Sequence, residues 1–473
     1  MSRTQFLGVG TFAKSPNVTA QTRKNMYLES YTEDDKVRIA AFPTPGLDLF
    51  TNFGEDPIRA IYEVGDKLYV VHRTTFYEVN NAGTVTNKGT LLTNEGRCSI
   101  IDNGTQIMVV DGQYGYIYTL STSVFAQITD PDFSATPRTV TFNGGYFIIT
   151  EDSSGKIWIS SLYDGTAWNA LEFATAESNP DNLVRVEEYI GHLILFGEDT
   201  TEFWVNTGEL DFPYSRQYGT NMEYGLAARW SVTKFDSSIM FLGRSRQGEV
   251  KVVKLTGTNA VPVSDRNLEN IFNSGASTLN VTAFSYMIDG HSMYQISFPV
   301  INRTFVYDGI TEVWHEMTSD YSRHRGEMGE QFINKQIVSD YANGKIYKFN
   351  KETYTDNGSV IIRELTGRHF ETNLDYFTVQ QFILDCETGI GLATGQGSDP
   401  QIMMQYSVDN GHTWSEELLR SLGKLGEYTD RVEWWRLGRG KDFLFRVRCS
   451  DPVKWVVTGA GLKIARQRRV AGY

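Results

Sequence analysis

The chain has 473 residues, of which 13% are aromatic, 43 are Gly and 12 are Pro, and its net charge is −13. Aromatic side chains suit half-buried strands and Gly suits tight turns, so this composition predicts an all-β protein with more than one domain. It excludes a membrane-spanning helix, because no apolar run approaches the roughly 20 residues that a bilayer requires.

The first 36 residues are polar and irregular in pattern, and we expect them to form an N-terminal arm. They lack an apolar segment followed by a cleavage site, so no signal peptide is expected. Residues 37–42 then have the pattern of a strand and precede a Pro-Thr-Pro-Gly turn at residues 43–46. In a closed propeller an early strand often completes the last blade, and residues 37–42 are the candidate for that role.

A repeat of about 40–50 residues runs through the next part of the chain, as is typical of β-propellers. Each copy has a turn marked by Gly or Asp, a short apolar strand, a second turn and an aromatic-tipped strand. Clear copies of the first half are residues 64–71, 103–110 and 143–149, and copies of a Gly-x-Ile-aromatic second half are residues 115–118, 155–158 and 344–347. Some copies are weak, so the sequence predicts a propeller of six to seven blades within residues 37–355.

Residues 264–272 interrupt this strand pattern. Ser264 and Asp265 are suitable helix caps, and Leu268, Ile271 and Phe272 have helical spacing. We therefore expect a short amphipathic helix inserted between two blades.

The rhythm changes again after the Asp-Asn-Gly turn at residues 356–358. The strands predicted beyond it are residues 360–364, 377–387, 401–408, 431–436, 443–449 and 454–458. Their number and spacing predict a separate β-sandwich over residues 356–473.

Charge divides unevenly between the two predicted parts. From residue 360 to the end there are 15 basic and 14 acidic residues, a balance of +1, so the rest holds 29 basic and 43 acidic residues, a balance of −14. An acidic propeller repels phosphate, so it is a poor nucleic-acid binder but suits a surface that DNA passes without sticking. The chain ends in a basic group formed by Arg466, Arg468 and Arg469.

The sharpest short motif is an Asp-box, Ser-x-Asp-x-Gly-x-Thr-Trp. It consists of Ser407, Asp409, Gly411, Thr413 and Trp414. An Asp side chain can accept backbone N–H bonds across such a turn, Gly permits a positive φ, and the Trp packs beneath. We expect this motif to stabilise the fold and not to be catalytic.

Two tryptophans and two arginines in the predicted sandwich are candidate interface residues. They are Trp434, Trp435, Arg436 and Arg439. Aromatic residues and Arg are common interface anchors. Strand alternation places Trp434 and Arg436 on one face and Trp435 on the other, which predicts one Trp in the core and the other exposed to a partner. The alternative is that both Trp side chains lie in the core of their own domain.

Catalytic, cofactor and metal sites are not predicted. The paired carboxylates are adjacent, so strand geometry points them apart; the pairs are Asp34-Asp35, Glu187-Glu188 and Glu416-Glu417. The seven histidines have no metal-ligand spacing, and Cys98, Cys386 and Cys449 are far apart, which predicts free thiols made in a reducing compartment. We therefore expect a protein that is not an enzyme.

One alternative to this expectation is a sialidase-like or carbohydrate-binding propeller, as the Asp-box suggests. Sialidase chemistry would need three converging arginines. The candidates are Arg229, Arg244, Arg246, Arg303 and Arg325, and no pattern in the sequence groups three of them. Whether any surface binds glycans stays open.

Several stretches also share their order and spacing with one known family. They are residues 176–181 (Ala-Glu-Ser-Asn-Pro-Asp), 196–204 (Phe-Gly-Glu-Asp-Thr-Thr-Glu-Phe-Trp), 207–208, 268–271, 431–439 (Arg-Val-Glu-Trp-Trp-Arg-Leu-Gly-Arg), 443–448 and 451–453. Together they resemble the packaged-DNA stabilisation proteins of short-tailed bacteriophages, also called tail accessory or head-completion proteins. The turn at residues 42–47 departs from the family's Phe-Pro-Gly pattern by an inserted Thr-Pro.

The resemblance implies a non-enzymatic virion protein without cofactors, located in the phage tail and made in the bacterial host cytoplasm. Such a protein adds to the portal–adaptor stack after DNA packaging, forms a ring that the family implies to be a hexamer, and helps to retain the genome. It also implies contacts with portal and adaptor proteins and with the tail needle or tailspikes, while DNA passes nearby without sequence-specific binding.

Overall fold

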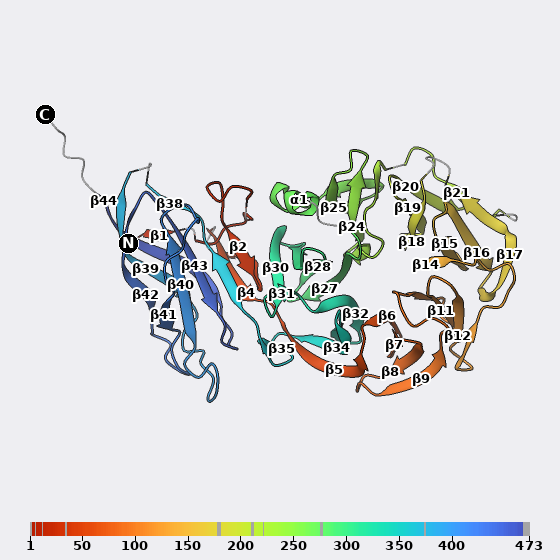
Figure 1. Ribbon diagram of the computed structural model, residues 1–473, viewed down its shortest axis with the longest axis horizontal. Helices are drawn as coiled ribbons and strands as arrows, with labels where there is room; N and C mark the ends of the chain where they lie inside the picture. Colours follow the sequence, from red (N-terminus) through yellow and green to blue (C-terminus); the bar gives the residue numbers. More distant parts are fainter. Residues whose placement is uncertain are drawn as a thin grey trace.

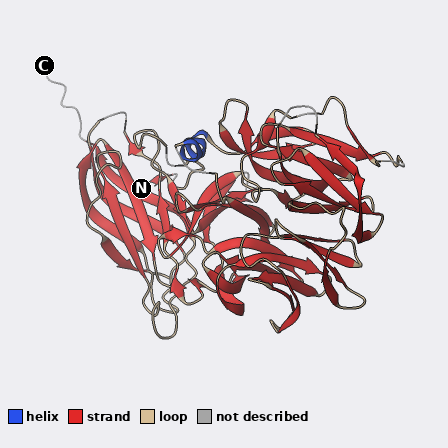
Figure 2. Cartoon of the chain, turned by 45° about the vertical axis from the view of Figure 1, so that its right-hand side comes forward, coloured by secondary structure: helices blue, strands red, loops and turns tan. Residues whose placement is uncertain are grey.

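The computed structural model describes residues 2–4, 6–11, 13–33, 36–176, 181–209, 212–220, 222–274, 278–372 and 375–466. A β-propeller and a β-sandwich lie side by side along the long axis of the molecule (Figure 1). Strands make up nearly all of the regular structure (Figure 2). Asp34-Asp35, residues 177–180, Arg468 and Arg469 lie outside the described residues.

The propeller has seven blades within the described residues, the upper end of the predicted range. Blade 1 is β6 (Ile58–Val64), β7 (Lys67–His72), β8 (Thr75–Val79) and β9 (Val85–Thr90). Blade 2 is β10 (Ser99–Asp102), β11 (Gln106–Val110), β12 (Gly115–Thr119) and β13 (Val124–Gln127). Blade 3 is β14 (Pro137–Asn143), β15 (Tyr146–Glu151), β16 (Lys156–Ser161) and β17 (Asp164–Thr175). Blade 4 is β18 (Leu183–Tyr189), β19 (His192–Gly197), β20 (Thr201–Asn206) and β21 (Tyr214–Arg216).

The remaining blades carry additional short strands. Blade 5 is β22 (Tyr224–Leu226), β23 (Thr233–Phe235), β24 (Ser238–Ser245), β25 (Val250–Thr256) and β26 (Asn259–Pro262); blade 6 is β27 (Thr282–Ile288), β28 (His291–Phe298), β29 (Arg303–Asp308) and β30 (Val313–Ser319), with β31 (Ser322–Arg323). Blade 7 is β32 (Gly326–Phe332), β33 (Lys335–Asp340), β34 (Asn343–Asn350) and β5 (Gly46–Glu55), extended by β35 (Thr355–Asp356) and β36 (Ser359–Val360).

A separate apolar cluster fills each of the seven junctions between neighbouring blades. Between blades 1 and 2, for example, Val71 and Phe76 pack with Ile107 and Tyr118. The cluster between blades 7 and 1 contains side chains from both, so the last junction is packed like the others. The short apolar strands of the sequence repeat therefore give each blade two buried faces, and packing of these faces against both neighbours holds the blades in a ring.

The predicted helix is present as α1 (Arg266–Asn273), between blades 5 and 6. Asp265 is its N-cap and accepts hydrogen bonds from the backbone N–H groups of Asn267 and Leu268. Leu268 and Phe272 are buried, and Ile271 packs against the same cluster. No helix in the described part of the chain is both long enough and apolar enough to span a bilayer.

The strand that closes the ring is β5, so the assignment of that role to residues 37–42 was wrong. β5 pairs antiparallel with β34, with Leu47 opposite Phe349. Residues 37–42 lie instead in β4 (Lys36–Pro43), which pairs with β3 (Met26–Glu33). The Pro-Thr-Pro-Gly turn separates β4 from β5, and β5 enters blade 7 at Gly46. Only glycine fits at residue 46, because a Cβ there would lie 2.3 Å from the carbonyl oxygen of Thr353.

The sandwich has two sheets, and the chain's N-terminal segments contribute to both. One sheet contains β3, β4, β44 (Val457–Arg466), β39 (Phe377–Cys386) and β42 (Val432–Gly440), with β1 (Ser2–Thr4) on β44. The other contains β2 (Thr22–Lys24), β37 (Arg363–Thr366), β43 (Asp442–Cys449), β40 (Gln401–Ser407) and β41 (Leu418–Ser421), with β38 (Phe370–Glu371) on β43.

The predicted irregular N-terminal arm was therefore wrong. Phe6, Met26 and Leu28 are buried in the sandwich core together with Trp434 and Trp455. The strand character of β3 was missed because its apolar residues are confined to its start, Met26 to Leu28, and residues 29–33 are mostly polar. Counting residues 1–45 with the sandwich sharpens the charge division: the sandwich part holds 21 basic and 18 acidic residues (+3), and residues 46–359 hold 23 basic and 39 acidic residues (−16).

The two parts are connected by backbone pairing as well as by the chain. β2 pairs with β30 of blade 6 on one side and with β37 of the sandwich on the other. Asn25 follows β2, and its side chain donates to Thr318 Oγ1 at 2.9 Å and to the carbonyl oxygen of Ile362 at 2.8 Å. The second sandwich sheet thereby continues into blade 6.

We propose that the chain divides near residue 355 and that residues 1–45 belong to the C-terminal part. A single proteolytic cut near residue 352 should then leave both fragments together, because β2, β3 and β4 remain attached to the propeller and paired in the sandwich. Size-exclusion chromatography after limited proteolysis checks this. A folded C-terminal fragment that elutes alone would contradict it.

Candidate functional site

Trp434 and Trp435 of β42 occupy opposite environments, as the alternation of the strand predicts. Trp434 is 0% exposed, its ring packs 5.8 Å from that of Phe382, and its indole N–H donates to the carbonyl oxygen of Leu418 at 2.9 Å. Trp435 is 51% exposed, and its indole N–H donates to Glu433 at 3.2 Å. Trp434 therefore belongs to the core, and Trp435 is available at the surface.

Arg436 does not share the face of Trp434, so that part of the prediction was wrong. Its backbone has a φ of +60°, and the register between β39 and β42 shifts at this point. The resulting bulge leaves Arg436 exposed beside Trp435, and Leu437 takes the inward position. A sequence pattern with a period of two cannot show such an insertion.

Basic side chains surround a second exposed aromatic ring at the same edge. Tyr376, which precedes β39, is 51% exposed, and Arg439 and Lys441 lie over its ring at 4.9 and 5.1 Å. Sequence reasoning missed both Tyr376 and Lys441. Tyr376 is distant in sequence from β42, and only the pairing of β39 with β42 brings it beside Arg439 and Lys441. Here the β42 face means the surface formed by Tyr376, Trp435, Arg436, Arg439 and Lys441.

The β42 face is suited to docking another protein. β42 is the edge strand of its sheet and lies, with β39, at the end of the molecule away from the blades (Figure 1). Exposed Trp and Tyr side chains supply large contact areas at low entropic cost, Arg adds charge, and these three residue types dominate measured binding energies.

The Asp-box forms the predicted turn after β40. Asp409 accepts hydrogen bonds from the Thr413 backbone N–H at 2.8 Å, the Thr413 hydroxyl at 2.6 Å and the Ser407 hydroxyl at 2.7 Å. These donors, led by the Thr413 hydroxyl, lower the pKa of Asp409 to about 2. Gly411 has a φ of +90° and donates its N–H to Ser407.

Trp414 differs from its expected place beneath the turn. It is half-buried, and the Arg446 guanidinium lies over its ring at 4.1 Å. The Asp-box lies in the sandwich and not in the propeller, where a sialidase site would be expected.

Replacing Asp409 with Ala should lower the free energy of unfolding by about 1 kcal/mol, because the turn loses its acceptor. Thermal melting of the purified protein checks this. A matched Asp430→Ala variant changes an exposed carboxylate in another loop and should melt like the parent. Unchanged stability of the Asp409→Ala variant together with a lost activity would contradict the structural role.

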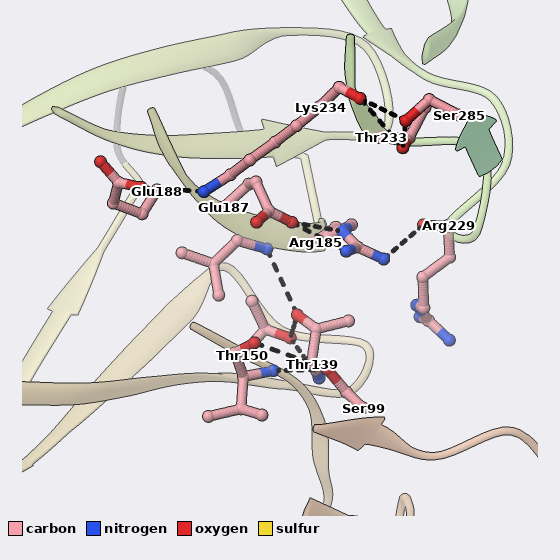
Figure 3. A network of polar contacts seen from close by, with 12 residues as sticks. Ser99, Thr139, Thr150, Arg185, Glu187, Glu188, Arg229, Thr233, Lys234 and Ser285 are labelled. Atoms are coloured by element: carbon pink, nitrogen blue, oxygen red, sulfur yellow. Dashed lines mark hydrogen bonds and ion pairs between the residues drawn. The ribbon is translucent and has the colours of Figure 1, made fainter. Parts of the chain in front are cut away.

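Polar contacts join the blades around the propeller axis (Figure 3). The Thr139 and Thr150 hydroxyls are 2.8 Å apart, and Thr139 also accepts from the backbone N–H of Val186 in blade 4. Lys234 of blade 5 pairs with Glu188 of blade 4 at 3.1 Å. These contacts link blade 3 to blade 4 and blade 4 to blade 5.

Charged side chains that the sialidase alternative would need are engaged separately. Glu187 pairs with Arg185 and Glu188 with Lys234, so the two carboxylates diverge as predicted. Arg229 pairs with Asp152, Arg303 with Glu316, and Arg325 with Asp320, so each of these arginines has a carboxylate partner of its own. Within the described ranges, no three His, Cys, Asp or Glu side chains are grouped closely enough to hold a metal ion.

Glu330 faces the propeller axis on β32 and has a displaced pKa. Burial, and then the nearby Glu63 carboxylate, raise its pKa from the ordinary 4.5 to about 8. The folded protein therefore holds a proton on Glu330 that the unfolded chain loses above about pH 4.5, so unfolding becomes easier as pH rises from about 4.5 to about 8.

A Glu330→Gln variant should be more stable than the parent at pH 8, by at least the roughly 1.4 kcal/mol that one pKa unit represents. It should also lose much of the decline in stability between pH 5 and pH 8. Denaturant titrations across this range check the prediction, with the exposed Glu352→Gln as control. Parallel pH profiles for all three proteins would contradict it.

Comparison with known proteins gives two matches that together span most of the chain. Residues 24–354 match the family described as "Bacteriophage P22 Gp10, beta-propeller", and residues 362–465 match "Bacteriophage P22 Gp10, beta-sandwich". A curated relative is the tail hub protein gp10 of Salmonella phage P22, which is 23% identical over 429 residues, 84% of each chain.

Solved structures with a similar propeller include a streptogramin B lyase and the Pan2 WD40 domain of Neurospora crassa. The lyase has a TM-score of 0.42 at 12% identity, covering 69% of this chain and 98% of its own; the WD40 domain has a TM-score of 0.43 at 9% identity, covering 65% and 96%. The two sequence-family matches account for the propeller and the sandwich in the observed order. The chain therefore belongs to the bacteriophage P22 Gp10 family, of which it carries both the β-propeller and the β-sandwich.

Proposed function

We propose that this protein is a structural, non-enzymatic subunit of a bacteriophage tail hub. The observation that carries the proposal is the family match over both parts of the chain, together with its similarity to a phage tail hub protein. In this role the subunit adds to the portal–adaptor stack as part of a closed ring, retains packaged DNA, and supports the needle or tailspikes. The ring is proposed to contain six copies.

The β42 face is the proposed contact with the adaptor or with a neighbouring subunit. Its exposed Trp435 and Tyr376 can enter apolar pockets of a partner, and Arg436, Arg439 and Lys441 can pair with acidic groups at the rim. Its location at the far end of the sandwich leaves the propeller clear of this contact (Figure 1).

The acidic propeller is proposed to border the DNA exit path. A balance of −16 over residues 46–359 repels phosphate and so disfavours adhesion of the passing genome. The DNA would pass beside the disc, because the cavity on the propeller axis, lined from all seven blades, has a volume of only about 450 Å³.

The proposal can be tested with a phage whose copy of this gene carries a nonsense mutation. In a non-suppressing host we expect particles that package DNA and then lose it, and complementation by the intact chain should restore filled particles. Fully infectious, DNA-filled particles without the chain would overturn the role. Hydrolysis of a fluorogenic sialoside that is abolished by one carboxylate substitution would favour the sialidase alternative instead.

A further inference from the structure

Two neighbouring cavities lie in the propeller. One, of about 450 Å³, lies on the axis, where it is lined by the inner strands of all seven blades and by Trp230. The other, of about 650 Å³, is lined by residues of blades 1, 2, 6 and 7, among them Arg73 and Tyr341. Arg97, in the loop before β10, lines both cavities.

Arg97 differs from the other guanidinium groups near the axis. Its guanidinium stacks on the Trp230 ring of blade 5 at 4.7 Å. Its Nη1 atom is buried and has no hydrogen-bond partner in the described part of the chain. By contrast, Arg185 binds Glu187 through two nitrogens, and Arg59 donates to four carbonyl oxygens of the neighbouring loops.

A buried guanidinium that forms no direct ion pair is costly, because it has left water for weak compensation. The carboxylate that acts on Arg97 is Glu327, which is itself paired with Arg323 at 2.7 Å. Burial lowers the pKa of Arg97 to about 10, so it still carries its charge at neutral pH. The smaller cavity also contains the charges of Arg185, Lys234 and Glu187, whereas Glu330 is largely protonated at pH 7. Because Arg185 is paired with Glu187 and Lys234 with Glu188, the positive charge at this cavity that lacks a direct ion-pair partner among the described residues is that of Arg97.

The rest of the cavity wall indicates what kind of anion fits. Ile61, Val232 and Phe284 supply apolar surface. A volume of about 450 Å³ exceeds what a bare inorganic ion needs and lies within the range of small-molecule sites. A phosphate dianion would bring a second negative charge toward Glu187, whereas a carboxylate brings one charge and matches the guanidinium fork.

We propose that the 450 Å³ cavity is a binding site for an organic carboxylate, whose two oxygens bind Arg97 and whose apolar part contacts Ile61, Val232 and Phe284. The carboxylate belongs either to a free small acid or to an acidic side chain of another protein inserted into the axis. This site is separate from the proposed docking contact, which lies on the β42 face at the opposite end of the molecule.

The proposal predicts that carboxylates stabilise the intact chain beyond the effect of ionic strength. Thermal melting is measured in acetate, butyrate and hexanoate and in a short Glu-containing peptide, each against sodium chloride of equal ionic strength. We expect higher melting temperatures, with dissociation constants that decrease from acetate to hexanoate. Stabilisation by the peptide but not by the free acids would identify a protein side chain as the source.

An Arg97→Met variant keeps the stacked stem and removes the charge. It should fold without carboxylate and bind the best ligand at least tenfold more weakly than the parent. Arg73→Met, which changes an exposed arginine at the larger cavity, should bind like the parent. The proposal is overturned if no carboxylate exceeds chloride in the parent protein, or if Arg97→Met and the parent bind equally.

Discussion

Replacing Trp434 with Ala lowers the free energy of unfolding by about 3–5 kcal/mol, the cost of emptying a packed core position. Trp434 is fully buried against Phe382, and its indole N–H satisfies the carbonyl oxygen of Leu418. Replacing the adjacent, half-exposed Trp435 with Ala should change stability by less than about 0.5 kcal/mol, as is usual for surface positions. Denaturant unfolding of the purified variants measures both effects.

The same two variants separate folding from assembly. Trp435→Ala should fold normally, yet its incorporation into particles should fall, because loss of a central aromatic anchor typically costs 2 kcal/mol or more of binding, about thirtyfold. Co-purification of the variant with DNA-filled particles provides the measurement. The docking role of the β42 face is wrong if Trp435→Ala assembles and retains DNA normally, or if both variants melt early.

Replacing Leu47 with Ala should lower the free energy of unfolding by about 2–5 kcal/mol, since it removes a buried side chain from the strand that closes the ring. Leu47 is 0% exposed and packs with Tyr286 of blade 6 and Tyr347 of blade 7. Leu49 lies two residues along the same strand, is 47% exposed, and serves as the matched control.

Leu49→Ala should leave stability within about 0.5 kcal/mol of the parent. Thermal and urea unfolding of both variants test whether β5 holds the propeller together. Equal, small losses in the two variants would mean that ring closure by β5 contributes little to stability.

Much of the fold could be predicted from the sequence because it depends on local patterns. The repeating apolar strands and Gly-marked turns indicated a propeller, and the spacing of Leu268, Ile271 and Phe272 indicated α1. The later strand pattern indicated a sandwich, and four of its strands begin within two residues of their expected positions. Each of these signals is contained within a few dozen neighbouring residues.

The errors share one physical cause, which is pairing between segments distant in sequence. Nothing local in residues 37–42 shows whether the strand will join blade 7 or the sandwich, since its apolar residues could be buried in a β-sheet of either part. The N-terminal strands acquire their role only through partners several hundred residues later, such as β37 and β44. The mostly polar residues 29–33 of β3 therefore resembled an irregular arm.

The candidate site was predictable to a similar extent. Alternation along β42 separated Trp434 from Trp435 correctly, but the bulge at Arg436 depends on the register with β39. Tyr376 joins Arg439 only through the same pairing. Arg97 gave no signal at all in the sequence, because its contact with Trp230 crosses the axis of the ring.

The central claim is that this chain is a structural component of a phage tail, and quantitative mass spectrometry of purified, DNA-filled virions tests it most directly. We predict that the chain is present at several copies per particle, in a fixed ratio to the portal protein. Its absence from DNA-filled particles, with the chain recovered only in the soluble fraction of the lysate, would contradict the account.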